Sequence, residues 1–382
     1  MSKPKNKKEI IILAVDTSCD DTSVAVLKNR IVLSSVVSSQ VELHQKWGGV
    51  VPDIARRAHK ENIEKVYLEA LKRAKIAEKE IDFFAVTYGP GLAIALEVGV
   101  DFIKNLAILN KKPLIPINHM EGHLLSSLLL NKNNQGKIKI NQEDKLFPAL
   151  GLLISGNHSE IVYVKKIGDY KILGETLDDA AGEAFDKVAR MLNLGYPGGP
   201  IVSSLADKAK SDWNNPQKAW KEKGGKKPIS ELAGTFGLPI PMMRSGDFNF
   251  SFSGLKTACL YKTQELRQKY KKDTDWSYNF AREFINAISR SLSHKLIKAI
   301  EKYPEVKSVF VGGGVSNNKY ITREIGNIVR KLKKNYFVPD KKFRSDNAAM
   351  IGIAAYYNIL NKKNQLKADK ILELDRKPML RL

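Results

Sequence analysis

The chain carries one pattern twice: an apolar run, a short polar turn and a second apolar run. The paired runs are residues 10–15 with 23–27 and residues 149–154 with 159–164. Short runs rich in Ile, Val and Leu predict buried strands, and two of them joined by a polar turn predict a hairpin. Because the hairpin recurs after a long interval, we expect two similar halves.

The segments between and after the hairpins alternate between helix and strand patterns. This alternation predicts α/β layers in both halves. The expected helices are 55–74, 91–109, 281–303 and 348–360, and the further strands are 83–87 and 308–311. We expect one lobe over residues 9–130 plus 348–382 and a second over 131–347, with a polar surface excursion at 207–234.

Composition predicts a globular protein and allows a nucleic-acid partner. The chain has 382 residues, of which 43% are hydrophobic, enough for two domains with cores. Two cysteines are too few for a disulfide framework, and neither a secretory leader nor a long apolar run is evident, so we expect a cytoplasmic protein with no membrane contact. The net charge of +22 favours a polyanionic partner, although a lysine-rich genome would give the same charge without one.

The sharpest local signal is the pair His119 and His123. Side chains four apart on a helix share one face, so two imidazoles at this spacing can bind one cation. The spacing also suits two solvated or hydrogen-bonded histidines. A metallopeptidase motif of this kind needs Glu directly after the first His, but Met120 stands there and Glu121 points to another side of the helix.

A third metal ligand has to come from elsewhere in the chain. Asp346 lies in the polar turn before the apolar helix 348–360 and is well placed to supply it. Asp346 or Ser345 could equally cap that helix, and the pattern by itself favours capping.

Glycine turns form a second group of candidates. They lie at 89–91, 155–156, 198–199 and 312–314, several of them directly after strands, where they could present backbone N–H groups to a phosphate. Each is also compatible with an ordinary turn. The chain has no P-loop sequence (Gly-x-x-x-x-Gly-Lys-Ser/Thr), which excludes a P-loop NTPase.

Acidic residues form a third group. Asp16, Asp20 and Asp21 occupy the first hairpin turn, where a carboxylate pair could orient a water, a metal or an amine. Asp179, Glu183 and Asp186 share a helical face that could meet ribose hydroxyls. Solvated charge is the alternative for both groups.

Taken together, these motifs resemble the TsaD/Kae/Qri family of tRNA threonylcarbamoyl transferases. The matching motifs are, in order, 16–22, His44 with 48–52, 87–91, 118–123, 154–156, 178–187, 196–200, 252–257, 313–316 and 345–347. The resemblance implies a two-lobed actin/Hsp70/sugar-kinase-like α/β fold with duplicated subdomains. It also implies an acyltransferase that moves the threonylcarbamoyl group from threonylcarbamoyl-AMP to N6 of adenosine 37 in tRNAs reading ANN codons.

The resemblance assigns residues and partners as well. It implies that His119, His123 and Asp346 hold one divalent metal per subunit, iron or alternatively zinc, which makes Asp346 a ligand instead of a cap. Asp20 and Asp21 match two acidic residues near the reacting group and are catalytic candidates. The implied partners are tRNA, a TsaB-like paralogue and a TsaE-like ATPase. The implied substrate-binding residues are Leu153, Ile154, Ser155, Gly156, Asn157, Asp186, Gly199 and Asn318.

Several positions depart from the family pattern. The family has Glu where Asp16, Asp21 and Asp53 stand, and the shorter side chain moves the carboxylate by about one methylene. Asn157 replaces the second Gly of a Ser-Gly-Gly turn, where a left-handed backbone would suit Asn. Leu153 stands where archaeal and eukaryotic members have a metal-binding Tyr, which favours the bacterial branch.

Three rival functions follow from the same features. An ATP-dependent small-molecule kinase of the same fold would not need the histidine pair, and a metallopeptidase would need a differently placed Glu. A non-catalytic interaction module would resemble the bacterial paralogues, which lack the metal residues that this chain retains.

Overall fold

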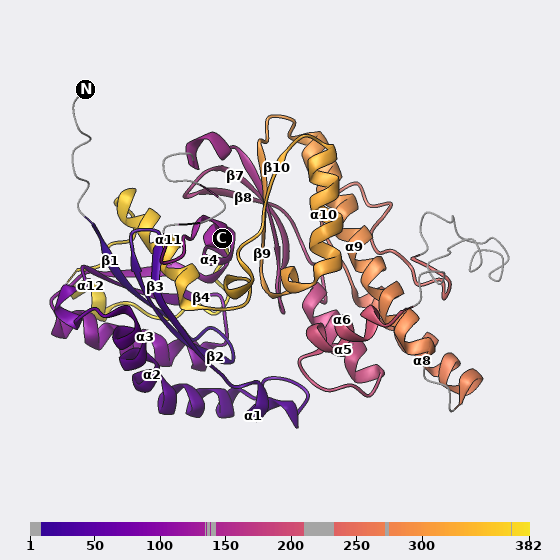
Figure 1. Ribbon diagram of the computed structural model, residues 1–382, viewed down its shortest axis with the longest axis horizontal. Coiled ribbons are helices and arrows are strands. Elements are labelled where there is room, and N and C mark those ends of the chain that lie inside the picture. Colours follow the sequence, from indigo (N-terminus) through magenta and orange to yellow (C-terminus); the bar gives the residue numbers. More distant parts are fainter. Residues whose placement is uncertain are drawn as a thin grey trace. The chain divides into compact units, whose positions relative to one another are not determined.

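The computed structural model describes residues 9–133, 135, 138, 143–209, 233–271, 275–367 and 369–382 (Figure 1). The chain divides into two compact units, of which the first comprises Met1–His44, Val50–Asn141 and Pro339–Leu382, and the second Gln45–Gly49 and Gln142–Val338. These bounds differ from the expected lobes at 131–141 and 339–347, which belong to the first unit, and at 45–49, which belong to the second. Within 339–347, Phe343 is buried, and with Lys342 it lines a groove along Val32 and Leu33 of the first unit.

The first unit is built on a five-stranded mixed sheet. Its strands are β1 (Ile11–Asp16), β2 (Asp21–Lys28), β3 (Ile31–Ser39), β4 (Phe83–Gly89) and β5 (Leu114–Asn118), in the order β3-β2-β1-β4-β5. The pairs β1–β2 and β2–β3 are antiparallel, whereas β1–β4 and β4–β5 are parallel. The expected hairpin at the start of the chain is therefore the middle of this sheet.

Helices cover both faces of the first sheet. The helices described in this part of the chain are α1 (Val41–Gln45), α2 (Pro52–Ala74), α3 (Ala93–Leu109), α4 (His119–Leu125), α11 (Ala348–Leu360) and α12 (Asp369–Leu372), of which α2, α3 and α11 pack on the sheet. Leu13 and Val26 pack in one core with residues of α2 and α3. Leu27, the next residue along β2, faces the other way and meets Gly352 of α11. Successive strand residues point to opposite faces, so α11 covers the face opposite to α2 and α3.

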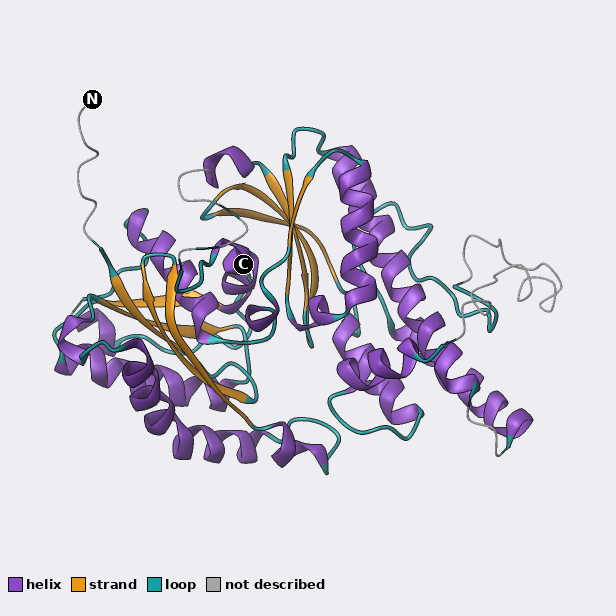
Figure 2. Cartoon of the chain, viewed as in Figure 1, coloured by secondary structure: helices purple, strands orange, loops and turns teal. Residues whose placement is uncertain are grey.

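The second unit repeats this sheet. Its strands are β6 (Ala149–Ile154), β7 (Ser159–Lys166), β8 (Asp169–Glu175), β9 (Ser308–Gly312) and β10 (Asn335–Phe337), in the order β8-β7-β6-β9-β10. The first two pairs are antiparallel and the last two parallel, as in the first unit. Figure 2 shows the strands of both units in orange. The expectation of two similar halves is confirmed.

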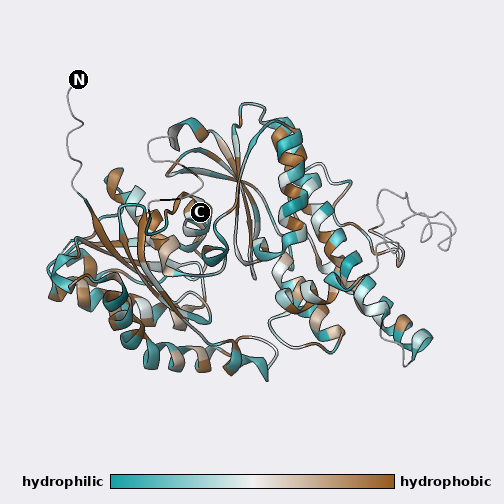
Figure 3. Ribbon diagram, in the orientation of Figure 1, coloured by the Kyte–Doolittle hydropathy of each residue, from teal (hydrophilic) through white to brown (hydrophobic). Residues whose placement is uncertain are grey.

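Five α-helices accompany the sheet among the described residues of the second unit. They are α5 (Ala181–Met191), α6 (Gly198–Asp207), α8 (Ser253–Tyr270), α9 (Trp276–Lys302) and α10 (Lys319–Lys331). Helix α9 is buried on most of its surface. On α10 the buried residues Ile321, Ile325 and Val329 recur at four-residue spacing, which gives the mixed teal and brown colouring of this helix (Figure 3). Short 3-10 turns occur at Glu78–Glu80, Ser126–Leu128, Glu143–Leu146, Gly314–Asn317 and Lys341–Phe343.

The expected elements are present, with shifted ends. Helix α2 begins at Pro52 because proline suits the first helical position, and α9 begins at Trp276 because Trp276 and Phe280 are also buried. Most of the excursion at 207–234 lies outside the described residues, and only 207–209 and 233–234 fall within them. No helix in the described part of the chain is long and apolar enough to span a bilayer.

Gly313 and Gly314 allow a test of backbone strain and close packing at the end of β9. Gly313 has φ +91°, and a Cβ there would press against the Ile154 carbonyl, whereas a Cβ at Gly314 would meet no described atom within 4 Å. We expect Gly313→Ala to lower the free energy of unfolding by about 2 kcal/mol or more. Trp276 is buried in the core of the second unit, so tryptophan fluorescence during urea unfolding reports on this unit. Gly314→Ala is the matched control, with an expected change within about 0.5 kcal/mol, and equal effects would contradict the assignment of strain.

Candidate functional site

Two histidines and one aspartate meet where α4 packs against α11. His119 and His123 lie one turn apart on α4, and Asp346 lies just before α11. Asp346 Oδ1 is 3.1 Å from His123 Nε2 and 3.6 Å from His119 Nε2. The ligand atoms of the three side chains all lie within 4.8 Å of one another, so the group could hold a metal ion.

Gly122 allows the two helices to approach. A Cβ at this position would lie 3.0 Å from Ile351 Cδ1 and 3.2 Å from Met350 Cγ, both of which are buried side chains of α11. A larger residue would push α4 away from α11. Asn118 fixes the start of α4, because its side chain accepts hydrogen bonds from the backbone N–H groups of the second and third helical residues at 2.8 Å and 3.3 Å.

Asn347, and not Asp346 or Ser345, caps helix α11. Its side-chain oxygen accepts a hydrogen bond from Met350 N at 3.1 Å, which satisfies one free N–H of the first turn. The capping interpretation of Asp346 is therefore wrong, because the next residue does this work and leaves the Asp346 carboxylate to face the histidines. An Asn directly before an apolar helix was a usable signal for this cap.

The charges of the group balance one another. Burial opposes a charged His119, but the carboxylates of Asp346 and Asp16 outweigh it and raise the pKa of His119 to about 10. Burial also opposes a charged Asp346, yet His119 and His123 hold the pKa of Asp346 well below its usual range. In the absence of a cation, a proton on His119 balances the carboxylate, and a bound cation would take over that role.

The donor set fits a divalent metal. Two imidazoles and a carboxylate are common ligands of zinc and of non-haem iron. Ligand atoms that share such an ion lie roughly 3.0–3.4 Å apart, and the distances from Asp346 Oδ1 are 3.1 Å and 3.6 Å. His123 is 1% exposed, and within the described residues its Nε2 has no hydrogen bond, although it lies 3.1 Å from Asp346 Oδ1. A cation bound by these two atoms would account for the buried nitrogen.

The acidic turn between β1 and β2 is fixed at several points. Ser18 N donates to Asp16 Oδ1 at 3.2 Å, Leu92 N donates to Ser18 O at 2.8 Å, and Gln40 N donates to Asp20 O at 3.0 Å. Asp16 Oδ1 also lies 3.7 Å from the Nδ1 atom of His119. The first unit thus brings the acidic turn and the metal candidates together.

The two catalytic candidates on this turn, Asp20 and Asp21, lie in surroundings that disfavour a charged carboxylate. Burial raises the pKa of Asp20, and burial together with the charges of Asp20 and Asp346 raises the pKa of Asp21 to about 7. One carboxylate oxygen of Asp21 is buried and lacks a hydrogen bond within the described part of the chain. A carboxylate of this kind is suited to accept a proton near neutral pH.

The expected substrate residues all lie in the second unit. The turn after β6 is closed by a hydrogen bond from His158 N to Ser155 Oγ at 3.2 Å. Its carbonyls Ser155 O and Gly156 O accept hydrogen bonds at 3.2 Å and 2.9 Å from backbone N–H groups at the start of α5. Asp186 on α5 accepts a hydrogen bond from Gly198 N at 2.7 Å, which ties α5 to the start of α6.

Asn318 completes the set. Its Nδ2 donates to Ser203 Oγ of α6 at 2.9 Å, and its Oδ1 accepts from Ile321 N at 3.0 Å and caps α10. Gly313, a few residues before Asn318, packs against Ile154 O at the end of β6. The segment that carries Asn318 is thus in contact with the end of β6. The side chains of Leu153 and Ile154 are fully buried, so only their backbone can reach a ligand, whereas Gly156 and Asn157 are exposed.

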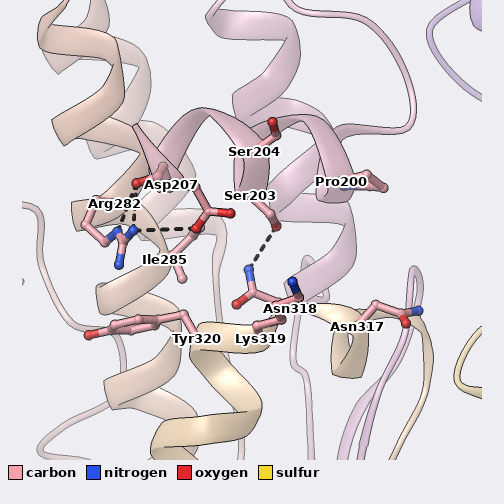
Figure 4. Close-up of a pocket in the computed structure, with 11 residues that line it drawn as sticks. Pro200, Ser203, Ser204, Asp207, Arg282, Ile285, Asn317, Asn318, Lys319 and Tyr320 are labelled. Carbon is pink, nitrogen blue, oxygen red and sulfur yellow. Dashed lines mark hydrogen bonds and ion pairs between the residues drawn. The ribbon is translucent and has the colours of Figure 1, made fainter. Parts of the chain in front are cut away.

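A pocket of about 200 Å³ opens beside Asn318 (Figure 4). Arg282 of α9 donates to Ala206 O at 2.7 Å and 3.1 Å and lies 3.7 Å from the Asp207 carboxylate. Its guanidinium also lies 5.3 Å from the centre of the Tyr320 ring. The pocket thus presents an amide, a hydroxyl and an aromatic ring, which suit a polar ring system better than an aliphatic chain.

Comparison with known proteins decides the family. The family described as "TsaD: tRNA N6-adenosine threonylcarbamoyltransferase" matches residues 31–353. The chain is 43% identical over 347 residues to the tRNA N6-adenosine threonylcarbamoyltransferase of Thermosipho melanesiensis, covering 91% of this chain and 94% of that protein. It is 40% identical over 351 residues to the protein of the same name from Staphylococcus haemolyticus, covering 92% of each. The chain belongs to the TsaD family.

A solved structure confirms the fold expected for a TsaD protein. The structure of HypF from T. kodakarensis superposes with a TM-score of 0.55 at 15% identity, over 93% of this chain and 48% of that one. At this identity the likeness concerns the fold alone. It agrees with the duplicated sheets and with the actin/Hsp70/sugar-kinase-like architecture.

Two departures from the TsaD pattern have structural explanations. The backbone angle φ of Asn157 is not positive, so this turn does not use the left-handed conformation that would suit Asn. Leu153 is buried inside β6 between its partners on β7 and β9, where its side chain cannot act as a ligand.

The metallopeptidase alternative is not favoured by this geometry. Met120, at the position where that chemistry needs a glutamate, is 1% exposed. Glu121 accepts a hydrogen bond from Asn358 Nδ2 of α11 at 3.3 Å and is buried. This contact links α4 to α11 and engages the Glu121 carboxylate away from the role of a general base.

Asp21 gives a test of the acidic turn. A carboxyl whose pKa is raised on folding destabilises the folded state once pH rises above its unfolded pKa, and the cost is complete above the folded value of about 7. In metal-free protein we expect Asp21→Asn to be more stable than the parent. The gap should widen by about 2–3 kcal/mol between pH 5 and pH 8. Urea unfolding followed by circular dichroism measures it, and a pH-independent gap would contradict the burial argument. Asp53→Asn, at an exposed position on α2, controls for the loss of one negative charge.

Proposed function

We propose that this TsaD protein transfers the threonylcarbamoyl group of threonylcarbamoyl-AMP to N6 of adenosine 37 in tRNAs that read ANN codons. The main support is its similarity, over more than nine tenths of its length, to proteins named for this transferase activity. The charge of +22 is consistent with tRNA as the macromolecular substrate.

The reaction is an acyl transfer from an activated donor. The N6 lone pair attacks the carbamoyl carbonyl carbon of the mixed anhydride, the bond from that carbon to the phosphate oxygen breaks, and AMP leaves. N6 gives up one proton. We assign Asp21, with Asp20, to accept it, because the raised pKa of Asp21 lies close to neutral pH.

The metal would be held by His119, His123 and Asp346. The proposal favours iron over zinc, since two histidines and one carboxylate are a frequent ligand set of non-haem iron. A divalent ion bound there supplies positive charge that stabilises a developing oxyanion.

The adenylate would be held by the second unit. A Cβ placed on Gly156 or Gly199 would meet no described atom within 4 Å, so a phosphate or ribose can approach the backbone at these two glycines. We assign binding to Leu153, Ile154, Ser155, Gly156, Asn157, Asp186, Gly199 and Asn318, the first two through their backbone only.

Partners and location follow from the family resemblance. We propose that a TsaB-like paralogue and a TsaE-like ATPase assist the transfer, and that it takes place in the cytoplasm.

Reconstitution tests the activity. The protein is incubated with tRNA, threonine, bicarbonate, ATP and a threonylcarbamoyl-adenylate synthase, with and without the two partner proteins, and the nucleosides are analysed by mass spectrometry. We expect threonylcarbamoyladenosine to form. Absence of the modified nucleoside under all conditions would refute the proposal. Transfer of radiolabel from γ-labelled ATP to a small molecule would favour the kinase instead.

A substitution of Asp346 tests the metal role. We expect Asp346→Ala to lower transfer by a factor of about a hundred or more and to reduce the metal content measured by mass spectrometry. Asp369→Ala, an exposed aspartate of the same unit, is the matched control and should retain both. Full activity in protein shown to be free of metal would contradict this role.

A further inference from the structure

His59 of helix α2 contacts the acidic turn without being part of it. The residue is 0% exposed. Its Nε2 lies 3.0 Å from Cys19 O, and its Nδ1 lies 2.8 Å from Thr22 Oγ1. Cys19 and Thr22 directly flank Asp20 and Asp21, so one imidazole bridges both ends of the catalytic pair.

The two contacts define the tautomer. A carbonyl oxygen only accepts hydrogen bonds, so Nε2 must carry the proton and donate it to Cys19 O. In a neutral ring Nδ1 then accepts from the Thr22 hydroxyl. Burial lowers the pKa of His59 against the opposing effects of the Cys19 carbonyl and the Asp16 and Asp20 carboxylates, in agreement with a neutral ring. Both ring nitrogens are satisfied, and the ring is held in one orientation.

The turn needs such a contact. Asp20 and Asp21 are adjacent carboxylates in partly buried surroundings, and both burial and mutual repulsion favour an opened turn in which they reach water. Backbone N–H groups hold Ser18 O and Asp20 O. The carbonyl between them, Cys19 O, is held by the side chain of His59.

We propose that His59 is a positioning residue that keeps Asp20 and Asp21 in place through the hydrogen bond from Nε2 to Cys19 O, with Thr22 fixing its tautomer. The link to catalysis rests on the proposed function, which assigns the two aspartates to the reaction. The stabilisation of the turn by His59 can be measured without any assay of that function.

Cys19 is a built-in probe of this turn. The chain has two cysteines, and Cys259 is fully buried whereas Cys19 is partly exposed. Burial and the neighbouring Asp20 raise the pKa of the Cys19 thiol, so it reacts slowly while the turn is closed. Faster labelling of the folded protein with a thiol reagent such as Ellman's reagent therefore reports on local opening at Cys19. A Cys19→Ser variant gives the background rate.

Replacement of His59 by Gln or by Asn distinguishes the contribution of its hydrogen bond from that of its packing. The side-chain nitrogen of Gln reaches the position of imidazole Nε2, whereas that of Asn reaches only the position of Nδ1. We expect His59→Asn and His59→Ala to label about tenfold faster than the parent, the factor for one buried hydrogen bond worth about 1.4 kcal/mol. His59→Gln should stay within about twofold.

Transfer kinetics give the second readout. We expect His59→Asn to lower kcat about tenfold with KM for tRNA unchanged, and His59→Gln to restore kcat. Metal content should stay the same across the series. His294→Gln, a histidine substitution in the second unit, should change neither labelling nor transfer.

The outcomes are distinct. Unchanged labelling in His59→Asn, or equal acceleration in the Asn and Gln variants, would overturn the proposal. If the His59 variants do not fold, Thr22→Val is the alternative, because it keeps the side-chain shape and removes the hydroxyl. We expect Cys19 to label about threefold faster in this variant. A labelling rate equal to that of the parent would overturn the role of Thr22. The expected labelling pattern in a protein without transfer activity would refute the proposed function while supporting the hold on the turn.

Discussion

The close packing of α4 against α11 is the constraint on which the metal group depends. His119 and His123 are far from Asp346 in sequence, and they meet only because Gly122 lets the two helices approach. The approach is reinforced by the buried contact between Glu121 and Asn358. A glycine and a glutamate between the two histidines therefore serve the packing of the site, and the histidines serve its chemistry.

The acidic turn shows how a stable sheet can carry an unfavourable feature. Its carboxylates are crowded and partly removed from water, as the raised pKa values of Asp20 and Asp21 show. The strands on either side are buried and paired over their full length. A rigid hairpin and several backbone hydrogen bonds thus hold groups that would separate in a flexible loop, and functional sites commonly draw on stability in this way.

Much of the fold could be predicted from the sequence because its elements are long and strongly apolar. The helix 348–360 and the strand 149–154 match the structure residue for residue. The turns were harder. Asp346 and Asn347 are both good capping residues, and only the three-dimensional contacts decide which caps the helix and which faces the histidines. His59 could not be found from spacing, because its partners belong to a different element and the contact to Cys19 is with a backbone carbonyl.

The first unit is assembled from three separate pieces of chain, and this bears on how the protein is made. During synthesis the second unit can be completed once residue 338 has left the ribosome, while the first unit still lacks α11. Until α11 emerges, one face of the first sheet stays uncovered, and Asp346 is not yet there to join His119 and His123. The group that could hold the metal is thus completed among the last parts of the molecule, and a metal held by all three side chains can bind only after nearly the whole chain has been synthesised.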